Sequence, residues 1–207
     1  MRSTALVSLA TMLLITLGGC ATDPAADKPD ATVAPAQPVG EAAPQGDVLT
    51  ITADSKIGWV GSKVTGSHEG GFTDFDGRIT LVGNDPTASS VNVTIDTTSL
   101  WSDTEDLTAH LKSADFFDVA AYPTATFQST SIAAAPTGYV ATGNLNLHGV
   151  EKSISFPAEI EILDGSVTVR ASFSIKRFDF GIVYAGKADN LIRDEVAITF
   201  DLRAASL

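Results

Sequence analysis

Alternation between apolar and polar residues is the feature of this sequence that most limits its fold. The alternating segments all follow residue 47, and they are residues 79–81, 91–95, 145–147, 154–162, 167–175 and 196–202. Successive side chains of an extended strand point to opposite faces, so this pattern predicts strands with one apolar face. Turn-forming residues at 83–87 and 163–165 favour short antiparallel connections between the strands. We therefore expect an all-β fold, either an antiparallel barrel or a sandwich.

The segment 100–119 departs from this alternation. Leu107 and Leu111 have the spacing of neighbours on one face of a helix. Acidic residues, which a helix dipole favours near the helix start, are Asp103, Glu105 and Asp106. We expect a short helix over residues 104–113, with Ser102 or Asp103 as its cap.

Two adjacent phenylalanines, Phe116 and Phe117, follow this predicted helix. Neighbouring side chains of a regular strand cannot both face one core, so we expect a bent backbone at this point. The pair is expected to plug one end of a barrel. Direct contact with a ligand is the alternative.

The first 46 residues have a composition unlike the rest of the chain. Residues 1–19 are expected to be a lipoprotein signal peptide, because an arginine precedes a short apolar run and residues 17–20 resemble the lipobox of bacterial lipoproteins. Cys20, the only cysteine, is then the lipidated residue, and an ordinary cleaved signal is the alternative. Residues 20–46 are rich in alanine and proline and are expected to form a disordered tether. The folded domain is expected to span residues 47–207.

The location follows from this interpretation. The residue after Cys20 is Ala21 rather than aspartate, which points to the outer membrane in bacteria that sort lipoproteins by this residue. We expect a protein anchored in the bacterial cell envelope and facing the periplasm. The net charge of −12 argues against nucleic acid as a partner, and it predicts that membrane contact depends on the acyl anchor alone.

Catalytic and metal-binding patterns are weak. The histidines are His68, His110 and His148, and their spacing matches no metal motif. The chain has no G-x-S-x-G sequence. We therefore expect no metal, no cofactor and no enzymatic activity.

Three blocks of sequence resemble the YceI-like family. They read "HLKSADFFDVAAYPTATFQST" at 110–130, "GNLNLHGVEKSISF" at 143–156 and "RFDFGI…DEVAITFDL" at 177–202, and the likeness extends over nearly all of 48–204. The resemblance implies a lipocalin-like, eight-stranded antiparallel barrel with a short helical insertion. It also implies a periplasmic protein that holds a polyisoprenoid chain, and it brings no catalytic residues.

One departure from the family lies near the first strand. Several members have Val-Lys-His there, whereas this chain has Lys63 between Ser62 and Val64, with His68 further on. We expect the segment 64–71 to be a polar, mobile loop. If it borders the mouth of the barrel, the preference for a head group can differ from that of other members.

The proposed ligand is an isoprenoid lipid, either a quinone or a polyprenyl chain, inside an apolar barrel. The residues expected to form the ligand-binding wall are Trp59, Ile79, Leu81, Val93, Ile95, Phe127, Leu145, Leu147, Phe156, Ile160, Val169, Phe173 and Phe200. Because the chain is acidic, we expect a neutral head group in preference to a phosphate. The alternatives are a filled barrel that acts as a protein-interaction module and, less favoured, a lipid-modifying enzyme. The oligomeric state is left open.

Overall fold

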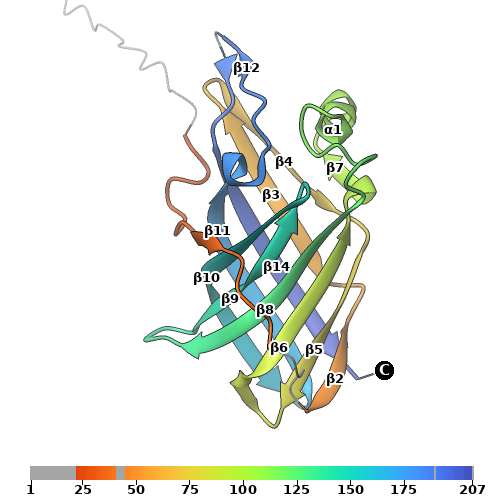
Figure 1. Cartoon of the computed structure of the whole chain (residues 1–207), viewed down its shortest axis with the longest axis vertical. Helices are drawn as coiled ribbons and strands as arrows, with labels where there is room; N and C mark the ends of the chain where they lie inside the picture. The colour runs from red at the N-terminus through yellow and green to blue at the C-terminus, as the bar shows by residue number, and fades with distance from the viewer. Residues whose placement is uncertain (1–21, 41–44, 189, 207) are drawn as a thin grey trace, which may run out of the picture.

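The computed structural model describes residues 22–40, 45–188 and 190–206 (Figure 1). The predicted signal peptide and Cys20 lie outside the described residues. The strands that form the barrel wall are β2 (Asp47–Ile51), β5 (Phe75–Val82), β6 (Asp85–Asp96), β8 (Thr124–Ala134), β9 (Tyr139–Leu147), β10 (Val150–Leu163), β11 (Ser166–Lys176) and β14 (Glu195–Ala205).

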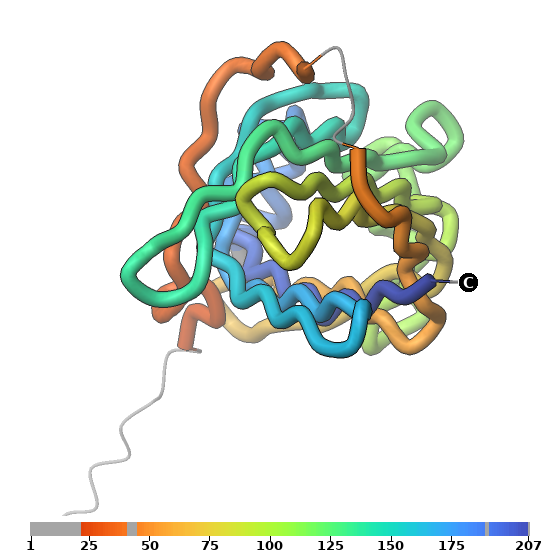
Figure 2. The backbone as a smooth tube through the Cα atoms, turned by 90° about the horizontal axis from the view of Figure 1, so that it is seen from below, coloured from red at the N-terminus to blue at the C-terminus, as the bar shows by residue number. Residues whose placement is uncertain are grey.

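These strands close on themselves. Each pairs antiparallel with the next in the order β2–β5–β6–β8–β9–β10–β11–β14, and β14 returns to β2. Seen from below, the strands surround a central axis (Figure 2). The prediction of an eight-stranded antiparallel barrel is therefore confirmed, and the alternating segments of the sequence lie in its wall.

A second group of strands lengthens one end of the barrel. It consists of β3 (Lys56–Lys63), β4 (Gly66–Phe72) and β7 (Leu100–Ser102), in which β3 pairs with β14 and β4 lies between β3 and β7. The expectation of a mobile loop at 64–71 is wrong, because most of that segment is β4. Its glycines and polar residues hide the alternation, and the strand is defined by backbone pairing to both neighbours.

The helix prediction is confirmed in position. Helix α1 spans Glu105–Lys112, and its N-cap is Thr104, which makes no side-chain capping hydrogen bond. The expectation that Ser102 or Asp103 caps the helix is therefore wrong. The hydroxyl of Ser102 instead donates to the carbonyl of Thr104 at 2.8 Å, which ties the approach to the helix.

Strands β10 and β11 diverge along part of their length. Their backbones pair between 159–163 and 166–170, while above this region the two strands no longer pair with each other, although β11 stays paired with β14 and β10 with β9. Strand β1 (Thr32–Pro35) pairs with residues 152–155 of β10, and the preceding residue, Ala31, donates its N–H to the carbonyl of Ser174 on β11 at 2.8 Å. The N-terminal segment thus bridges the seam between the two strands.

The expected disorder of residues 20–46 is wrong for residues 22–37. Composition indicated correctly that this segment has no core of its own, but the diverging strands leave unpaired backbone groups that it satisfies. Gln37 extends the contact, since its N–H donates to Asn144 Oδ1 at 2.9 Å and its carbonyl accepts from Asn144 Nδ2 at 2.7 Å. We call residues 22–37 the strap.

The two ends of the barrel differ. Around Ile79 and Leu81 at the lower end, side chains from opposite walls meet and leave a space of only about 10 Å³. Toward the end that carries β3, β4 and α1, the walls stand further apart. No helix among the residues described in the structure is long and apolar enough to cross a membrane.

Candidate ligand-binding cavity

The upper part of the barrel contains a cavity of about 470 Å³. This volume is typical of small-molecule sites, which span about 300–1,000 Å³. All strands of the wall except β2 and β5 contribute lining side chains, together with β3, β4, α1 and the loop that precedes β12 (Gly186–Lys187). The lining is almost entirely aliphatic and aromatic, because the alternation of each strand turns its apolar residues inward.

Most of the predicted wall residues line this cavity. They are Trp59, Val93, Ile95, Phe127, Leu145, Leu147, Phe156, Ile160, Val169, Phe173 and Phe200. Ile79 and Leu81 do not: both are buried at the filled lower end. The prediction that Ile79 and Leu81 line the cavity is therefore wrong. Alternation indicates which side chains point into the barrel, but it carries no information on how far away the opposite wall lies. Contact of the remaining residues with a ligand stays a prediction.

Four phenylalanines form a cluster across the middle of the cavity. Phe156 lies between Phe127, at a ring-centroid distance of 5.7 Å, and Phe173, on which it stacks at 4.3 Å. Phe200 packs edge-on against Phe173 at 5.5 Å. Together these rings present a rigid apolar surface to any molecule in the cavity.

Phe116 and Phe117 close part of the upper end and also line the cavity. Phe117 packs edge-on against Phe72 at 6.0 Å, and Phe116 packs edge-on against the His110 ring at 5.1 Å. Tyr184 completes this group at 5.2 Å from Phe116. The two phenylalanines thus cover part of one barrel end, as expected. Because the same rings also line the cavity, the alternative of direct contact with a ligand stays a prediction that is compatible with this position.

Several lining residues were not identified from the sequence. They are contributed by the helix, by the loop after β11 and by the diverging part of β10, and include Leu107, Leu111, Ile154, Ile182, Tyr184 and Ile192. Helical spacing did predict an apolar face for Leu107 and Leu111, but nothing local indicated which surface it would cover. The irregular segment 182–192 has no periodicity from which to assign a face.

Polar side chains gather where the cavity opens. Lys63 and Lys187 line this mouth and form no ion pair with any residue that the structure describes. His68 and His110 also line it, and each is engaged: His68 Nδ1 lies 3.0 Å from Asp103 Oδ1, and His110 Nε2 lies 2.9 Å from Asp115 Oδ2.

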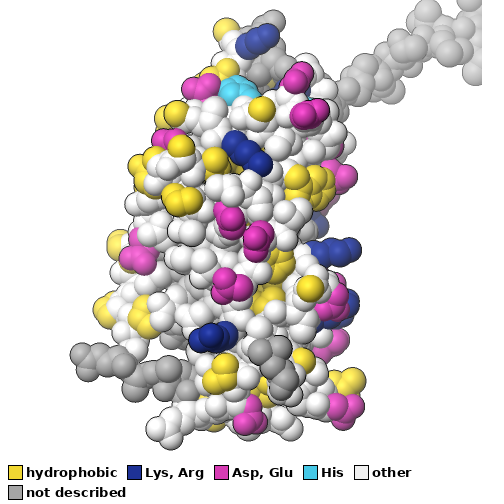
Figure 3. Space-filling model, turned by 90° about the vertical axis from the view of Figure 1, so that its right-hand side faces the viewer, with side chains coloured by type: hydrophobic (Ala, Val, Ile, Leu, Met, Phe, Trp, Pro, Cys, Tyr) yellow, Lys and Arg dark blue, Asp and Glu magenta, His cyan; other side chains and the backbone are white. Residues whose placement is uncertain are grey.

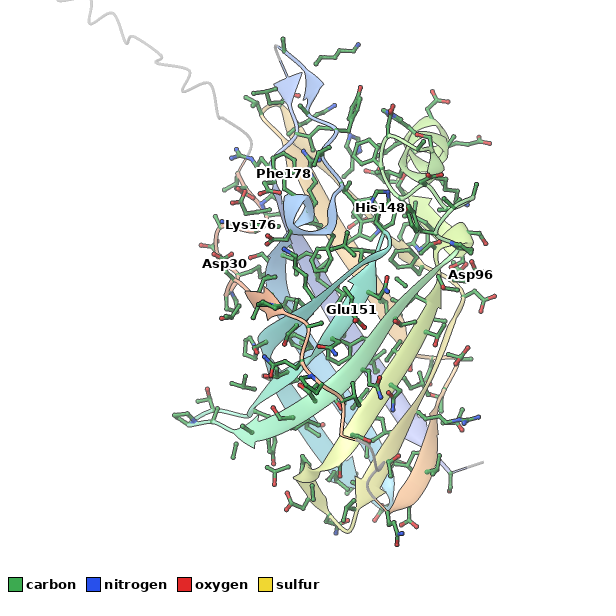
Figure 4. All side chains as sticks on the ribbon, in the orientation of Figure 1. Asp30, Asp96, His148, Glu151, Lys176 and Phe178 are labelled. Atoms are coloured by element: carbon green, nitrogen blue, oxygen red, sulfur yellow. The ribbon has the colours of Figure 1, made fainter. Side chains whose placement is uncertain are left out.

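Arg177 is the buried cation of the lining. Its guanidinium donates to three backbone carbonyls, those of Arg193 at 2.9 Å, Ile182 at 2.7 Å and Ile192 at 3.2 Å. Burial lowers the pKa of this guanidinium, and the charge of Asp194 partly opposes the shift. Its neighbour Lys176 is exposed on the outer side of the barrel (Figure 4). Arg177 therefore holds the irregular segment against the barrel.

The histidines have structural contacts. His148 Nδ1 lies 3.2 Å from the carbonyl oxygen of Phe180, and its ring packs on Tyr122 at 4.6 Å. Within the described ranges, no three metal-binding side chains come together in one place. The rings of His68 and His110 bond to carboxylates. Within the part of the chain that the structure describes, no histidine ring bonds to a hydroxyl or thiol that could act as a nucleophile.

A closed antiparallel barrel around an apolar cavity defines the lipocalin-like class of ligand-binding folds. Within that class the family model described as the YceI-like domain matches residues 50–204. The chain belongs to the YceI-like family.

The similar curated proteins match over part of the chain. Protein YceI of Escherichia coli O157:H7 is 44% identical over 91 residues, which are 44% of this chain and 48% of that protein. Protein YceI of Salmonella arizonae is 43% identical over 91 residues, with the same coverage of 44% and 48%. The chain spans about half the length of the curated relatives it matches.

Solved structures share the fold over most of the barrel. BcnA of Burkholderia cenocepacia superposes with a TM-score of 0.64 at 27% identity, covering 74% of this chain and 98% of that one. A polyisoprenoid-binding domain from Saccharophagus degradans superposes with a TM-score of 0.61 at 20% identity, covering 77% and 98%. At that lower identity the second likeness shows the fold alone.

Proposed function

We propose that this protein binds an isoprenoid lipid, a quinone or a polyprenyl chain, in the barrel cavity and serves as a membrane-anchored carrier or scavenger in the bacterial envelope. The observation that carries the proposal is the apolar cavity of about 470 Å³ in a member of the YceI-like family. The polyisoprenoid-binding domain from Saccharophagus degradans, which has the same fold, supports this class of ligand. A filled barrel that acts only as an interaction module predicts no such cavity.

The size of the cavity suits a short isoprenoid segment. A volume of about 470 Å³ holds roughly 15 carbon-sized groups if each takes about 30 Å³, the share of a water molecule in the liquid. That is about three isoprene units, and burial at about 0.8 kcal/mol per methylene-sized group contributes roughly 10 kcal/mol for them. Association costs several kcal/mol, so apolar burial supports binding without an elaborate polar site.

The proposed role involves no chemistry. An enzyme acting on the bound lipid needs a nucleophile or proton-transfer group in the wall. Two serines of the lining, Ser62 and Ser129, are buried. The hydroxyl of Ser129 accepts the N–H of Val91 at 2.8 Å, and the hydroxyl of Ser62 forms no hydrogen bond with any residue that the structure describes, so no neighbouring base among them is placed to activate it as a nucleophile. The buried charge of Arg177 is engaged by carbonyls. These contacts favour passive binding over catalysis.

The anchor and location are part of the proposal. Lipidation of Cys20 after removal of residues 1–19 would hold the protein on a membrane, since two or more acyl chains anchor durably. The expected site is the periplasmic face of the envelope, most simply the outer membrane. A Cys20→Ala variant made without residues 1–19 is expected to sediment with membranes much less than the acylated protein, and equal sedimentation of the two would contradict the anchor.

The test of the ligand is mass spectrometry of organic extracts. The Cys20→Ala protein, expressed in a bacterial envelope and purified without detergent, is expected to yield an isoprenoid at near-stoichiometric amount. Recovery of no isoprenoid, combined with no binding of added ubiquinone or polyprenol in a Trp59 fluorescence titration, would overturn the proposal.

A further inference from the structure

The strap begins beside the mouth of the cavity. Asp23, at its start, forms an ion pair with Arg193 at 3.4 Å. The N–H of Arg193 donates to the carbonyl of Ser62 at 2.9 Å, and the adjacent Ile192 lines the cavity together with Ser62. The first described residues of the chain are therefore held at the open end of the barrel.

Further contacts keep the strap on the barrel wall. Ala25 is buried, and the Asp30 side chain accepts a hydrogen bond from the buried hydroxyl of Ser174. Figure 4 shows Asp30 on the outer side of the barrel next to Lys176. With strand β1 paired to β10, the start of the strap cannot move away from the mouth unless these bonds break.

The position of the strap limits the reach of the anchor. Cys20 precedes Asp23 by three residues, and three residues span at most about 10 Å. A free tether from residue 20 to residue 46 would instead reach roughly 90 Å when extended. An acyl group on Cys20 is consequently restricted to the neighbourhood of the mouth.

The rim of the mouth also exposes apolar side chains. Val64 lies in the turn between β3 and β4 and is 52% exposed, while Leu191 of β13 (Asn190–Leu191) is 50% exposed. The N–H of Val64 donates to the carbonyl of Leu191 at 3.3 Å. The β3–β4 turn and the β12–β13 hairpin therefore lie together and form one tip, at the top of Figure 1. Val183, at 63% exposed, lies on the loop that leads to this tip.

Basic residues flank the apolar tip. Lys63 precedes Val64, and Lys187 lies in β12, the strand paired with β13. Figure 3 shows a basic side chain together with hydrophobic ones at the top of the molecule, above a band that carries acidic side chains. Exposed aliphatic groups beside lysines suit a phospholipid bilayer, where the aliphatic groups enter the acyl region and the ammonium groups meet lipid phosphates.

We propose that this rim, formed by Val64, Val183 and Leu191 with Lys63 and Lys187, docks on a phospholipid bilayer. The strap holds the anchored N-terminus beside the rim, so that a lipid passes between cavity and bilayer without crossing water. This inference rests on the proposed function. It also revises the expectation that the acyl anchor alone provides the membrane contact.

The first experiment measures where the rim lies. Single-cysteine variants Val64→Cys and Leu191→Cys of the acylated full chain, in which Cys20 is blocked by its lipid, are labelled with an environment-sensitive fluorophore. They are then bound to phosphatidylethanolamine–phosphatidylglycerol vesicles. Both labels are expected to shift to the blue on binding. The matched control is Leu163→Cys at the opposite end, where the native side chain is 73% exposed, and it is expected to stay unshifted.

The second experiment measures transfer. The double variant Val64→Asp/Leu191→Asp is expected to move ubiquinone between vesicles about tenfold more slowly than the native protein, because two aliphatic groups no longer enter the bilayer. Leu163→Asp is expected to transfer at the native rate. Equilibrium binding by the Cys20→Ala protein is expected to be unchanged in both variants, since none of the three side chains lines the cavity.

The outcomes separate this inference from the proposed function. Two results would overturn the docking rim and leave the proposed function standing. One is an equal fluorescence shift for all three labels. The other is an equal transfer rate for the tip variant and the Leu163→Asp control, in a protein that still binds its lipid. Absence of lipid binding in the native protein would instead refute the proposed function.

Discussion

The rings of Phe156 and Phe173 stack with an interplanar angle of 10° and a centroid distance of 4.3 Å. Phe156 belongs to β10 and Phe173 to β11, at a level where these two strands share no backbone ladder. The stack thus closes the seam from the inside, and the strap closes it from the outside. A stacked pair contributes about 0.5–1.5 kcal/mol beyond its burial, so we regard it as a main support of the cavity wall.

Filling the cavity is expected to block binding. Ala141 is buried and lines the cavity, so Ala141→Phe places a ring where the lipid chain would lie. We expect at least about tenfold weaker binding of ubiquinone or polyprenol, measured by fluorescence titration. The control is Val140→Phe, one residue along β9 on the outward face, where the native side chain is exposed. Equal affinity of the two variants would contradict the cavity as the binding site.

The two ends of the barrel are expected to respond differently to truncation. Leu81→Ala at the filled end should lower the free energy of unfolding by about 2–5 kcal/mol, because a cavity replaces close packing. It should leave lipid affinity unchanged, since Leu81 does not line the large cavity. Leu145→Ala removes a lining side chain and should weaken binding. Denaturant unfolding and titration of both variants check this, and loss of affinity in Leu81→Ala would be inconsistent with the assignment.

Loosening the strap is expected to expose it to proteases. Asn144→Ala removes both hydrogen bonds to the backbone of Gln37 and should cost about 1–3 kcal/mol of local stability. We expect faster cleavage between residues 22 and 37 in limited proteolysis followed by mass spectrometry, with the barrel intact. Thr130→Ala, on the neighbouring strand β8, serves as the control. Unchanged cleavage rates would show that the Gln37 contact does not hold the strap.

The stability is expected to fall in acid. Asp96 caps the turn η1 (Thr97–Ser99), and hydrogen bonds from the Thr98 hydroxyl and backbone N–H lower the pKa of its carboxyl below the ordinary value of 3.8. A lowered folded-state pKa stabilises the fold above the unfolded-state value of about 3.9, and this stabilisation is lost as the pH falls through the folded-state pKa. The free energy of unfolding should therefore decline below about pH 4.

The Asp96→Asn variant tests the origin of that decline. Asparagine also caps well, so stability at pH 7 should change little while the decline in acid becomes shallower. Asp54 and Asp85 also have lowered pKa values, so some decline should remain. Denaturant unfolding as a function of pH gives the slope, and an unchanged slope would rule out the Asp96 contribution.

The head group is expected to be neutral, and the mouth allows a direct test. Lys63→Gln/Lys187→Gln removes two positive charges from the cavity lining. With a neutral head group such as a quinone, affinity should stay within about twofold of the native value. An anionic head group would give a different result. The native protein would bind a prenyl phosphate in preference to the quinone, and the double variant would bind that phosphate at least tenfold more weakly, a loss of about 1.4 kcal/mol. Competition titrations with both ligands measure this.

Much of the barrel wall was predictable from the sequence. In β10 and β11 the apolar residues recur at every second position, so the sequence assigns residues such as Phe156 and Phe173 to the inner face without information on the partner strand. The helix was also predictable, because Leu107 and Leu111 have helical spacing and acidic residues favour its start. Both signals are local, and they agree with the structure.

Other features were missed because their signals are not local. Strand β4 is rich in glycine, and Gly70 leaves room for the Trp59 ring, since a side chain there would lie 2.3 Å from that ring. The strap has no apolar periodicity and is ordered by its fit to the seam. Arg177 directly follows Lys176 and has no local signal that distinguishes it from this exposed neighbour, yet the fold buries it against three carbonyls.

The sequence by itself determined which side chains face the barrel interior, because the period of two is a property of each extended strand and needs no neighbour. Only the tertiary structure decided where that interior is hollow. Ile79 and Val93 belong to similar alternating patterns, yet one packs at the filled end and the other lines the cavity. The separation of opposite walls depends on how the strands close and diverge and on what covers the seam, and these relationships join residues far apart in the chain.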